Sequence, residues 1–119
     1  MGIVDDDASL RAALARALRG SGIRVESFGS GEEFLERGNL AAADCIVLDI
    51  HLGGLSGFDL RDHLAAAGTV PPIIFITGHD DLFARRARES GACGFLRKPF
   101  DVSELLALVR PHLRPSTSR

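Results

Sequence analysis

Short unbroken apolar runs alternate with stretches of helical spacing along the whole chain. The clearest run is Cys45–Leu48, which ends at a single carboxylate, Asp49. Runs of this kind are typical of strands that are buried on both faces of a parallel sheet. A run that alternates apolar with charged residues, as 23–28 does, predicts a half-exposed edge strand. The predicted strands are 2–4, 23–28, 45–49, 73–76 and 94–97.

Stretches with helical spacing follow each of these runs. The apolar face of the first helix consists of Leu10, Ala13, Leu14, Ala17 and Leu18. Ser30 and Glu33 fit a capping box and predict a short helix to about Arg37. A third helix is predicted from about Phe58, with Leu60, Leu64 and Ala67 on one face. A fourth is predicted from Asp80 or Asp81 to Ser90. A fifth is predicted from Asp101 to Pro111, with an apolar stripe of Val102, Leu105, Leu106, Val109 and Leu113.

Five strand–helix units predict an α/β fold, a doubly wound parallel sheet with helices on both faces. Right-handed crossovers and an edge position for the second strand favour the order 2-1-3-4-5, the flavodoxin-like (βα)5 arrangement. We expect one domain over residues 1–114, and a polar tail or the start of a linker over 115–119.

Composition narrows the possible partners and the cellular setting. The chain has 119 residues, 45% of them hydrophobic, and a formal net charge of −2. Without a basic footprint we expect no direct nucleic-acid binding by this chain. No apolar run approaches the length of a membrane span, so we expect no membrane partner and a cytoplasmic location. Cys45 and Cys93 are too few for a metal cluster or a disulfide framework, and we interpret both as reduced core residues.

Acidic residues follow the first and third predicted strands. In the order 2-1-3-4-5 these strands are neighbours and the switch point lies between them, so Asp5, Asp6 and Asp49 should converge on one crevice. Thr77 and Lys98 should arrive there from the ends of the next two strands. Asp7, the third acid of the first cluster, is better explained as the cap of the first helix.

Three carboxylates in one crevice repel one another, so at least one of their pKa values should be raised. A divalent cation would allow all three to stay ionised, and oxygen ligands without a His/Cys cluster suit Mg²⁺ or Mn²⁺. Carboxylates also accept phosphoryl groups covalently. With the hydroxyl of Thr77 and the ammonium of Lys98 nearby, the site could hold a phosphoryl group on Asp49.

Four motifs at the predicted strand ends resemble the receiver (CheY-like) domain of two-component response regulators, over essentially the whole chain. They are IVDDD at 3–7, VLDI at 47–50, FITG at 75–78 and LRKPF at 96–100. The triplets TGH at 77–79 and KPF at 98–100 look most like the FixJ/NarL-type branch. Receivers of that branch usually precede a helix-turn-helix output domain.

The resemblance implies that Asp49 is the phosphoacceptor and receives its phosphoryl group from a sensor histidine kinase. It implies a Mg²⁺ site made of Asp6, Asp49 and the backbone carbonyl of His51, with Asp5 acting through a water. It also implies that the chain is no enzyme in the ordinary sense, because it would catalyse only its own phosphorylation and dephosphorylation.

Four further residues take roles by the same resemblance. Thr77 and Lys98 would contact the phosphoryl oxygens, and the peptide before Pro99 would be cis. Phe95 would be the switch aromatic that rotates as Thr77 moves. On phosphorylation, two copies of the chain could form a homodimer through the face made by the helix at 80–90 and the strand at 94–97.

The chain departs from the family pattern at three points. Gly53 stands where a proline is usual, which affects the rigidity of the loop rather than the chemistry. The first strand has only four residues before the acids, which indicates a weakened sheet centre or a truncated segment. His51 and His79 are expected to flank the entry of attacking water and are candidates for tuning the phosphoryl lifetime.

On this interpretation we expect the output to be transcription, through an output domain that is not in this chain. Alternatives are a stand-alone receiver, a phosphorelay intermediate, and an interaction module that is never phosphorylated. A more distant alternative is a phosphatase with an aspartyl-phosphate intermediate. Such haloacid-dehalogenase-like enzymes carry a DxD motif, whereas His51 occupies the second acid position here.

Overall fold

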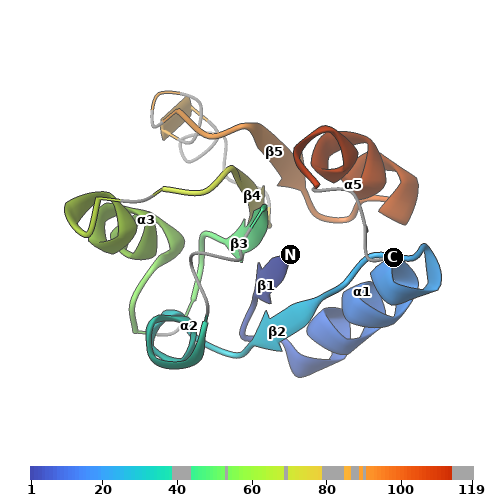
Figure 1. Cartoon of the computed structure of the whole chain (residues 1–119), viewed down its shortest axis with the longest axis horizontal. Helices are drawn as coiled ribbons and strands as arrows, with labels where there is room; N and C mark the ends of the chain where they lie inside the picture. The colour runs from blue at the N-terminus through green and yellow to red at the C-terminus, as the bar shows by residue number, and fades with distance from the viewer. Residues whose placement is uncertain are drawn as a thin grey trace, which may run out of the picture.

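A five-stranded parallel sheet in the order β2-β1-β3-β4-β5 runs through the middle of the computed structural model (Figure 1). This confirms the predicted order and the edge position of the second strand. The structure describes residues 1–38, 44–52, 54–68, 70–78, 85, 86, 89 and 91–113. The strands are β1 (Gly2–Val4), β2 (Glu26–Phe28), β3 (Ile46–Asp49), β4 (Ile73–Thr77) and β5 (Gly94–Arg97).

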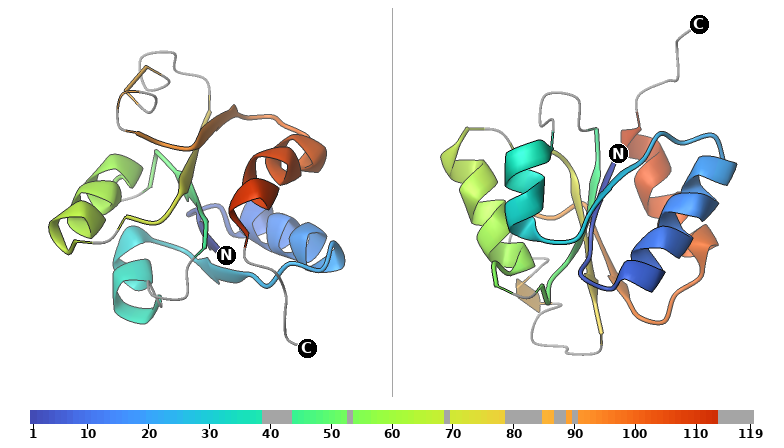
Figure 2. Two further views of the ribbon diagram at one scale, coloured as in Figure 1. Left: turned by 45° about the horizontal axis from the view of Figure 1, so that its top comes forward. Right: turned by 90° about the horizontal axis from the view of Figure 1, so that it is seen from below.

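Helices cover both faces of the sheet (Figure 2). On one face lie α1 (Ala8–Gly20) and α5 (Val102–Val109), and on the other lie α2 (Gly31–Arg37) and α3 (Gly57–Ala66). A 3₁₀ turn, η2 (Arg110–His112), follows α5 and contains Pro111, as expected of a residue that cannot continue a helix. Among the described residues, no helix has the length and apolar content to cross a membrane.

Several predicted features fall outside the described residues. They are Gly53, His79, the tail at 115–119 and most of the helix predicted from Asp80 or Asp81 to Ser90. Within that helix only Arg85, Arg86 and Glu89 are described, and all of them are helical.

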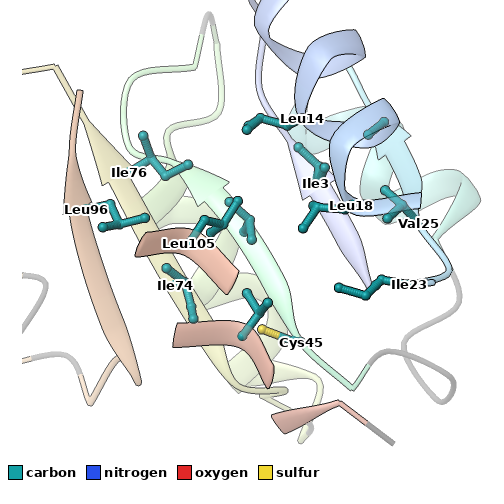
Figure 3. Close-up of a cluster of buried hydrophobic side chains, with 13 residues drawn as sticks. Ile3, Leu14, Leu18, Ile23, Val25, Cys45, Ile74, Ile76, Leu96 and Leu105 are labelled. Atoms are coloured by element: carbon teal, nitrogen blue, oxygen red, sulfur yellow. The ribbon is translucent and has the colours of Figure 1, made fainter. Parts of the chain in front are cut away.

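Alternation along the buried strands divides the core into two clusters, one on each face. Ile3 and Val47 pack with α1 and α5, whereas Val4, Ile46 and Leu48 pack with α2 and α3. Figure 3 shows the first cluster, in which Leu14 and Leu18 of α1 face the sheet together with Leu105. Both faces of β1 and β3 are therefore covered, which explains why their sequences read as unbroken apolar runs.

The short first strand lies between β2 and β3 without a gap in its pairing. Gly2 lies opposite Glu26 and Ile46, and Val4 lies opposite Phe28 and Leu48. Ile3 and Val4 are fully buried. The expected weakening of the sheet is therefore not seen in the strand pairing, because the three residues of β1 pair with both β2 and β3.

Two helix faces differ from the prediction by single residues. Ala13 is exposed and Ala15 is buried in its place, because the two flank the Leu14–Leu18 line on opposite sides and spacing alone does not separate them. Ala67 is also exposed, since it lies beyond the last residue of α3 as its C-cap.

The second strand begins later than predicted. It covers only Glu26–Phe28, although Ile23 and Val25 before it are buried in the α1/α5 cluster. These two residues therefore have the alternating pattern of a strand, because they pack on the core, without taking part in the ladder.

The two cysteines do not share an environment. Both are free, as predicted, and Cys45 is buried, where burial and the charge of Asp44 raise its thiol pKa to about 12. Cys93, however, is exposed, so its interpretation as a core residue is wrong. It directly precedes β5, the edge strand, where one side of the chain has no neighbouring strand.

Helix starts follow the predicted capping residues. The carboxylate of Asp7 accepts a hydrogen bond from Leu10 N–H at 3.1 Å, and the hydroxyl of Ser30 accepts one from Glu33 N–H at 3.0 Å. The Glu33 carboxylate departs from the standard box by accepting from Gly29 N–H, at 2.8 Å.

We predict that Gly57→Ala lowers the free energy of unfolding by about 1–3 kcal/mol, as overpacking of a rigid site does. A β-carbon at this position would lie 2.6 Å from the Asp49 carbonyl oxygen and 2.9 Å from Ile50 Cα, both of which are backbone atoms. Chemical denaturation followed by circular dichroism measures the change.

Gly20→Ala is the matched control, because a β-carbon there meets nothing within 4 Å. At the end of α1 it should be neutral or should stabilise by up to about 1 kcal/mol. Equal stability of Gly57→Ala and the wild type would contradict the close approach.

Candidate functional site

Three carboxylates meet where β1 and β3 end. Asp5 and Asp6 directly follow β1 and Asp49 is the last residue of β3, which pairs with β1 in parallel. One oxygen from each carboxylate lies within 4.8 Å of the others. Asp5 and Asp49 are only 1% and 4% exposed, whereas Asp6 faces solvent. The sheet order thus brings together the acids that the sequence predicted to converge.

Lys98 reaches the same place from the end of β5. Its Nζ lies 3.1 Å from Asp49 Oδ2 and 3.6 Å from Asp5 Oδ2, so one ammonium serves two buried carboxylates. The backbone N–H of Lys98 donates to the Thr77 carbonyl at 2.8 Å, which ties this segment to the end of β4. The Lys98–Pro99 peptide is cis, as the resemblance implied.

The Asp49 carboxylate is held at both of its oxygens. Oδ2 accepts from Lys98 Nζ, and Oδ1 accepts from the backbone N–H of His51 at 2.9 Å. Asp5 makes one hydrogen bond, in which Oδ1 accepts from Asp7 N–H at 2.9 Å, and its Oδ2 has only the 3.6 Å ion pair with Lys98. Asp5 Oδ2 is buried and has no hydrogen bond within the described part of the chain. The Asp49 carboxylate is therefore oriented more firmly than the Asp5 carboxylate beside it.

Thr77 contributes a hydroxyl that makes no hydrogen bond to any of the described residues. The residue is fully buried at the end of β4, and its Oγ1 has no hydrogen-bond partner there. The register pairs Asp49 with Ile76, which places Thr77 one residue beyond the end of β3. A buried hydroxyl without a partner carries a desolvation cost of about 1–3 kcal/mol, which a ligand oxygen would relieve.

The charges of this cluster shift two pKa values. The pKa of Asp5 is raised from 3.8 to about 6, mainly by burial and also by the negative charge of Asp49, which together outweigh the Asp7 hydrogen bond and the Lys98 charge. Burial acts to lower the pKa of Lys98, but its hydrogen bond to Asp49 and the two carboxylate charges outweigh this and raise it. One raised carboxyl pKa agrees with the expectation from three converging acids.

The donor set fits a hard divalent cation. Asp5, Asp6 and Asp49 offer only oxygen atoms, and two of these side chains are buried and have an ammonium as their cationic neighbour. Oxygen ligands of this kind suit Mg²⁺ or Mn²⁺. His51, the predicted source of a backbone carbonyl ligand, is an exposed residue two positions after Asp49.

Phe95, the predicted switch aromatic, is partly buried on β5. It lies opposite Phe75 in the register and packs against the α2/α3 cluster. Its position is thus intermediate between core and surface, and its switching role stays a prediction.

Two contacts of arginine residues near the site had no sequence signal. Arg11 Nη1 of α1 donates to the Asp5 carbonyl oxygen at 2.7 Å and so supports the backbone of the acidic pair. The guanidinium carbon of Arg86 lies 4.3 Å from the centre of the Phe58 ring, at the start of α3. The first contact joins residues only six positions apart, whereas Arg86 and Phe58 are far apart in the sequence, where periodicity carries no information.

A family model for the response regulator receiver domain matches residues 1–110. The chain belongs to this family. Its sheet order and the acidic cluster at the strand ends are those expected from the resemblance noted above.

Individual relatives support the same assignment. Nodulation protein W of Bradyrhizobium diazoefficiens is 44% identical over 108 residues, which cover 90% of this chain and 48% of that protein. Transcriptional regulatory protein FixJ of Azorhizobium caulinodans is 38% identical over 118 residues, which cover 98% of this chain and 56% of that protein. The match to FixJ agrees with the branch that the TGH and KPF triplets indicate.

A solved structure of the response regulator StyR superposes with a TM-score of 0.86 at 40% identity, over 94% of this receiver and 57% of that chain. The chain spans about half the length of the curated relatives that it matches, with 48% and 50% for two of them.

We predict that, without divalent cations, the Asp5 carboxyl makes the receiver less stable as the pH rises from about 4 to 6. The folded state binds this proton more tightly than the unfolded chain, with a pKa of about 6 against 3.8. The free energy of unfolding therefore falls between these values and stays lowered above them. Asp5→Asn should be more stable than the wild type at pH 7.5 in EDTA, and this advantage should shrink toward pH 4.

Thermal unfolding across this pH range measures the difference between the two proteins. Asp62→Asn, at an exposed position of α3, is the control and should follow the wild type at every pH. An Asp5→Asn advantage that does not vary with pH would contradict the raised pKa.

Proposed function

We propose that this receiver accepts a phosphoryl group on Asp49 from a sensor histidine kinase and thereby acts as a signalling switch. The observation that carries the proposal is the placement of the Asp49 carboxylate. One oxygen accepts from Lys98 Nζ and the other from His51 N–H, beside the carboxylates of Asp5 and Asp6. An oriented carboxylate next to a fixed cation is suited to attack on phosphorus, because most of the barrier is positioning and charge.

Asp6, Asp49 and the backbone carbonyl of His51 would hold Mg²⁺, with Asp5 acting through a water. Mn²⁺ would suit the same oxygen donors. When bound, the cation supplies positive charge next to the phosphoryl oxygens. The support for this set is the all-oxygen donor chemistry of the cluster and the excess of carboxylates over ammonium groups around it.

The transfer itself forms one bond and breaks one bond. A carboxylate oxygen of Asp49 forms a bond to phosphorus while the bond from phosphorus to the imidazole nitrogen of the kinase phosphohistidine breaks, and the electron pair returns to that nitrogen. Lys98 would neutralise charge on the phosphoryl oxygens. The Thr77 hydroxyl, which is buried and lacks a partner among the described residues, would donate to one of them.

The signal would pass to the face formed by β5 and the helix predicted at 80–90. Movement of Thr77 toward the phosphoryl group and rotation of Phe95 would bias two arrangements of this face. Homodimerisation through it is one consequence. Since FixJ is named a transcriptional regulatory protein and the chain covers 56% of it, we propose that the output is transcription through a further domain.

Stand-alone signalling and a relay role would use the same site chemistry. In each case we expect the chain to catalyse only its own phosphorylation and dephosphorylation. Sustained turnover of para-nitrophenyl phosphate would instead favour the phosphatase alternative.

With Mg²⁺ and acetyl phosphate, the wild type should gain the mass of one phosphoryl group, and Asp49→Asn should gain none. Intact-protein mass spectrometry measures both. Asp62→Asn, on the exposed side of α3, should label like the wild type. Equal labelling of Asp49→Asn and the wild type would reject Asp49 as the acceptor.

Asp6→Asn should weaken Mg²⁺ binding by about tenfold or more, since changes to groups outside the ligand set alone cost about 10–100-fold. The chain contains no Trp or Tyr, so isothermal titration calorimetry is the suitable measurement. Asp62→Asn again serves as the control. Unchanged affinity of Asp6→Asn would remove Asp6 from the proposed ligand set.

A further inference from the structure

The first turn of α2 packs against the loop that leads from Asp49 to α3. Leu55 N–H donates to the Glu32 carboxylate at 3.3 Å. At Gly31, which is buried, a β-carbon would lie 2.9 Å from Leu55 Cδ2 and 3.4 Å from Leu55 Cβ. Gly54 has φ +83°, and a β-carbon on it would lie 3.1 Å from the Glu32 carboxylate. Glycines on both sides therefore allow the helix and the loop to approach closely.

The same loop orients the predicted acceptor. It is closed at its base, where Gly57 N–H donates to the Ile50 carbonyl at 3.0 Å, and Ile50 N–H donates to the Ile76 carbonyl at 2.9 Å. His51 directly follows Ile50 in this loop, and its N–H donates to Asp49 Oδ1 at 2.9 Å. Leu55, at the far side of the loop, is partly buried against the α2/α3 cluster.

We propose that Glu32 is a positioning residue for phosphorylation, acting through the Leu55 N–H and the loop to keep His51 N–H on the Asp49 carboxylate. This inference rests on the proposed function of Asp49. Glu32 itself is exposed, and its contact with the loop is to a backbone group. Its contribution is thus a hydrogen bond that holds the loop, and the packing of Leu55 on Gly31 supports the same position.

A series of three variants separates the hydrogen bond from the charge. Glu32→Ala removes the acceptor, Glu32→Gln keeps an acceptor oxygen but removes the charge, and Glu36→Ala alters an exposed glutamate of the same helix. A hydrogen bond with a net value of about 0.5–1.5 kcal/mol corresponds to about a two- to tenfold change. Glu32→Ala should therefore slow phosphorylation by acetyl phosphate by about this factor, while Glu32→Gln and Glu36→Ala stay close to the wild type.

Hydrogen exchange of the His51 amide, followed by NMR without Mg²⁺ or phosphodonor, tests the route. In Glu32→Ala this amide should exchange faster by a similar factor, whereas amides of β1 and β4 should keep their wild-type protection. A purely structural role of Glu32 would instead lower the protection of these central strands together with that of His51.

Four results would overturn the proposal. They are wild-type phosphorylation of Glu32→Ala, an equal loss in Glu32→Gln, a loss of rate without faster His51 exchange, and protection lost equally in β1 and β4. Failure of the proposed function is distinguishable from these, because the wild type would then gain no phosphoryl group. The exchange comparison would still test whether Glu32 holds the loop.

Discussion

The site depends on repulsion between carboxylates that the sheet forces together. Asp5 and Asp49 are buried side by side, and Lys98 lies within 3.6 Å of the one and 3.1 Å of the other. With Asp6 at the rim, one ammonium faces three carboxylates and leaves negative charge in excess. The raised pKa of Asp5 is the direct consequence of this burial and repulsion. The charge balance of the site therefore favours the binding of a cation.

This arrangement follows from the order of the strands rather than from any one of them. Because β1 lies between β2 and β3, its three residues are enough to carry the acid pair to the end of β3. Lys98 comes from β5, with β4 between, and only a long side chain covers that separation. Its backbone is fixed to β4 through the Thr77 carbonyl, so the ammonium approaches Asp49 from a defined direction.

The fold and the convergence of the acids could be predicted from the sequence because both follow from buried runs and right-handed connections. The burial of residues that depends on how neighbouring elements pack could not be predicted in this way. Ala13 and Ala15 have equal spacing from Leu14, and only the packing of α1 distinguishes them. Cys93 reads as apolar but precedes an edge strand. The contact between Glu32 and Leu55 joins residues 23 positions apart through a backbone N–H, which no side-chain pattern encodes.

Two groups connect the resting site to the proposed switching. The Thr77 hydroxyl and Asp5 Oδ2 are buried and make no hydrogen bond within the described part of the chain. Their burial costs free energy in the resting state, and a phosphoryl oxygen next to Thr77 and a cation next to Asp5 would each remove part of that cost. Phosphorylation would then stabilise an arrangement in which Thr77 lies closer to Asp49. Because β4 pairs with β5 up to Thr77 and Arg97, a shift of Thr77 on phosphorylation would act first on the end of β5, the edge of the sheet.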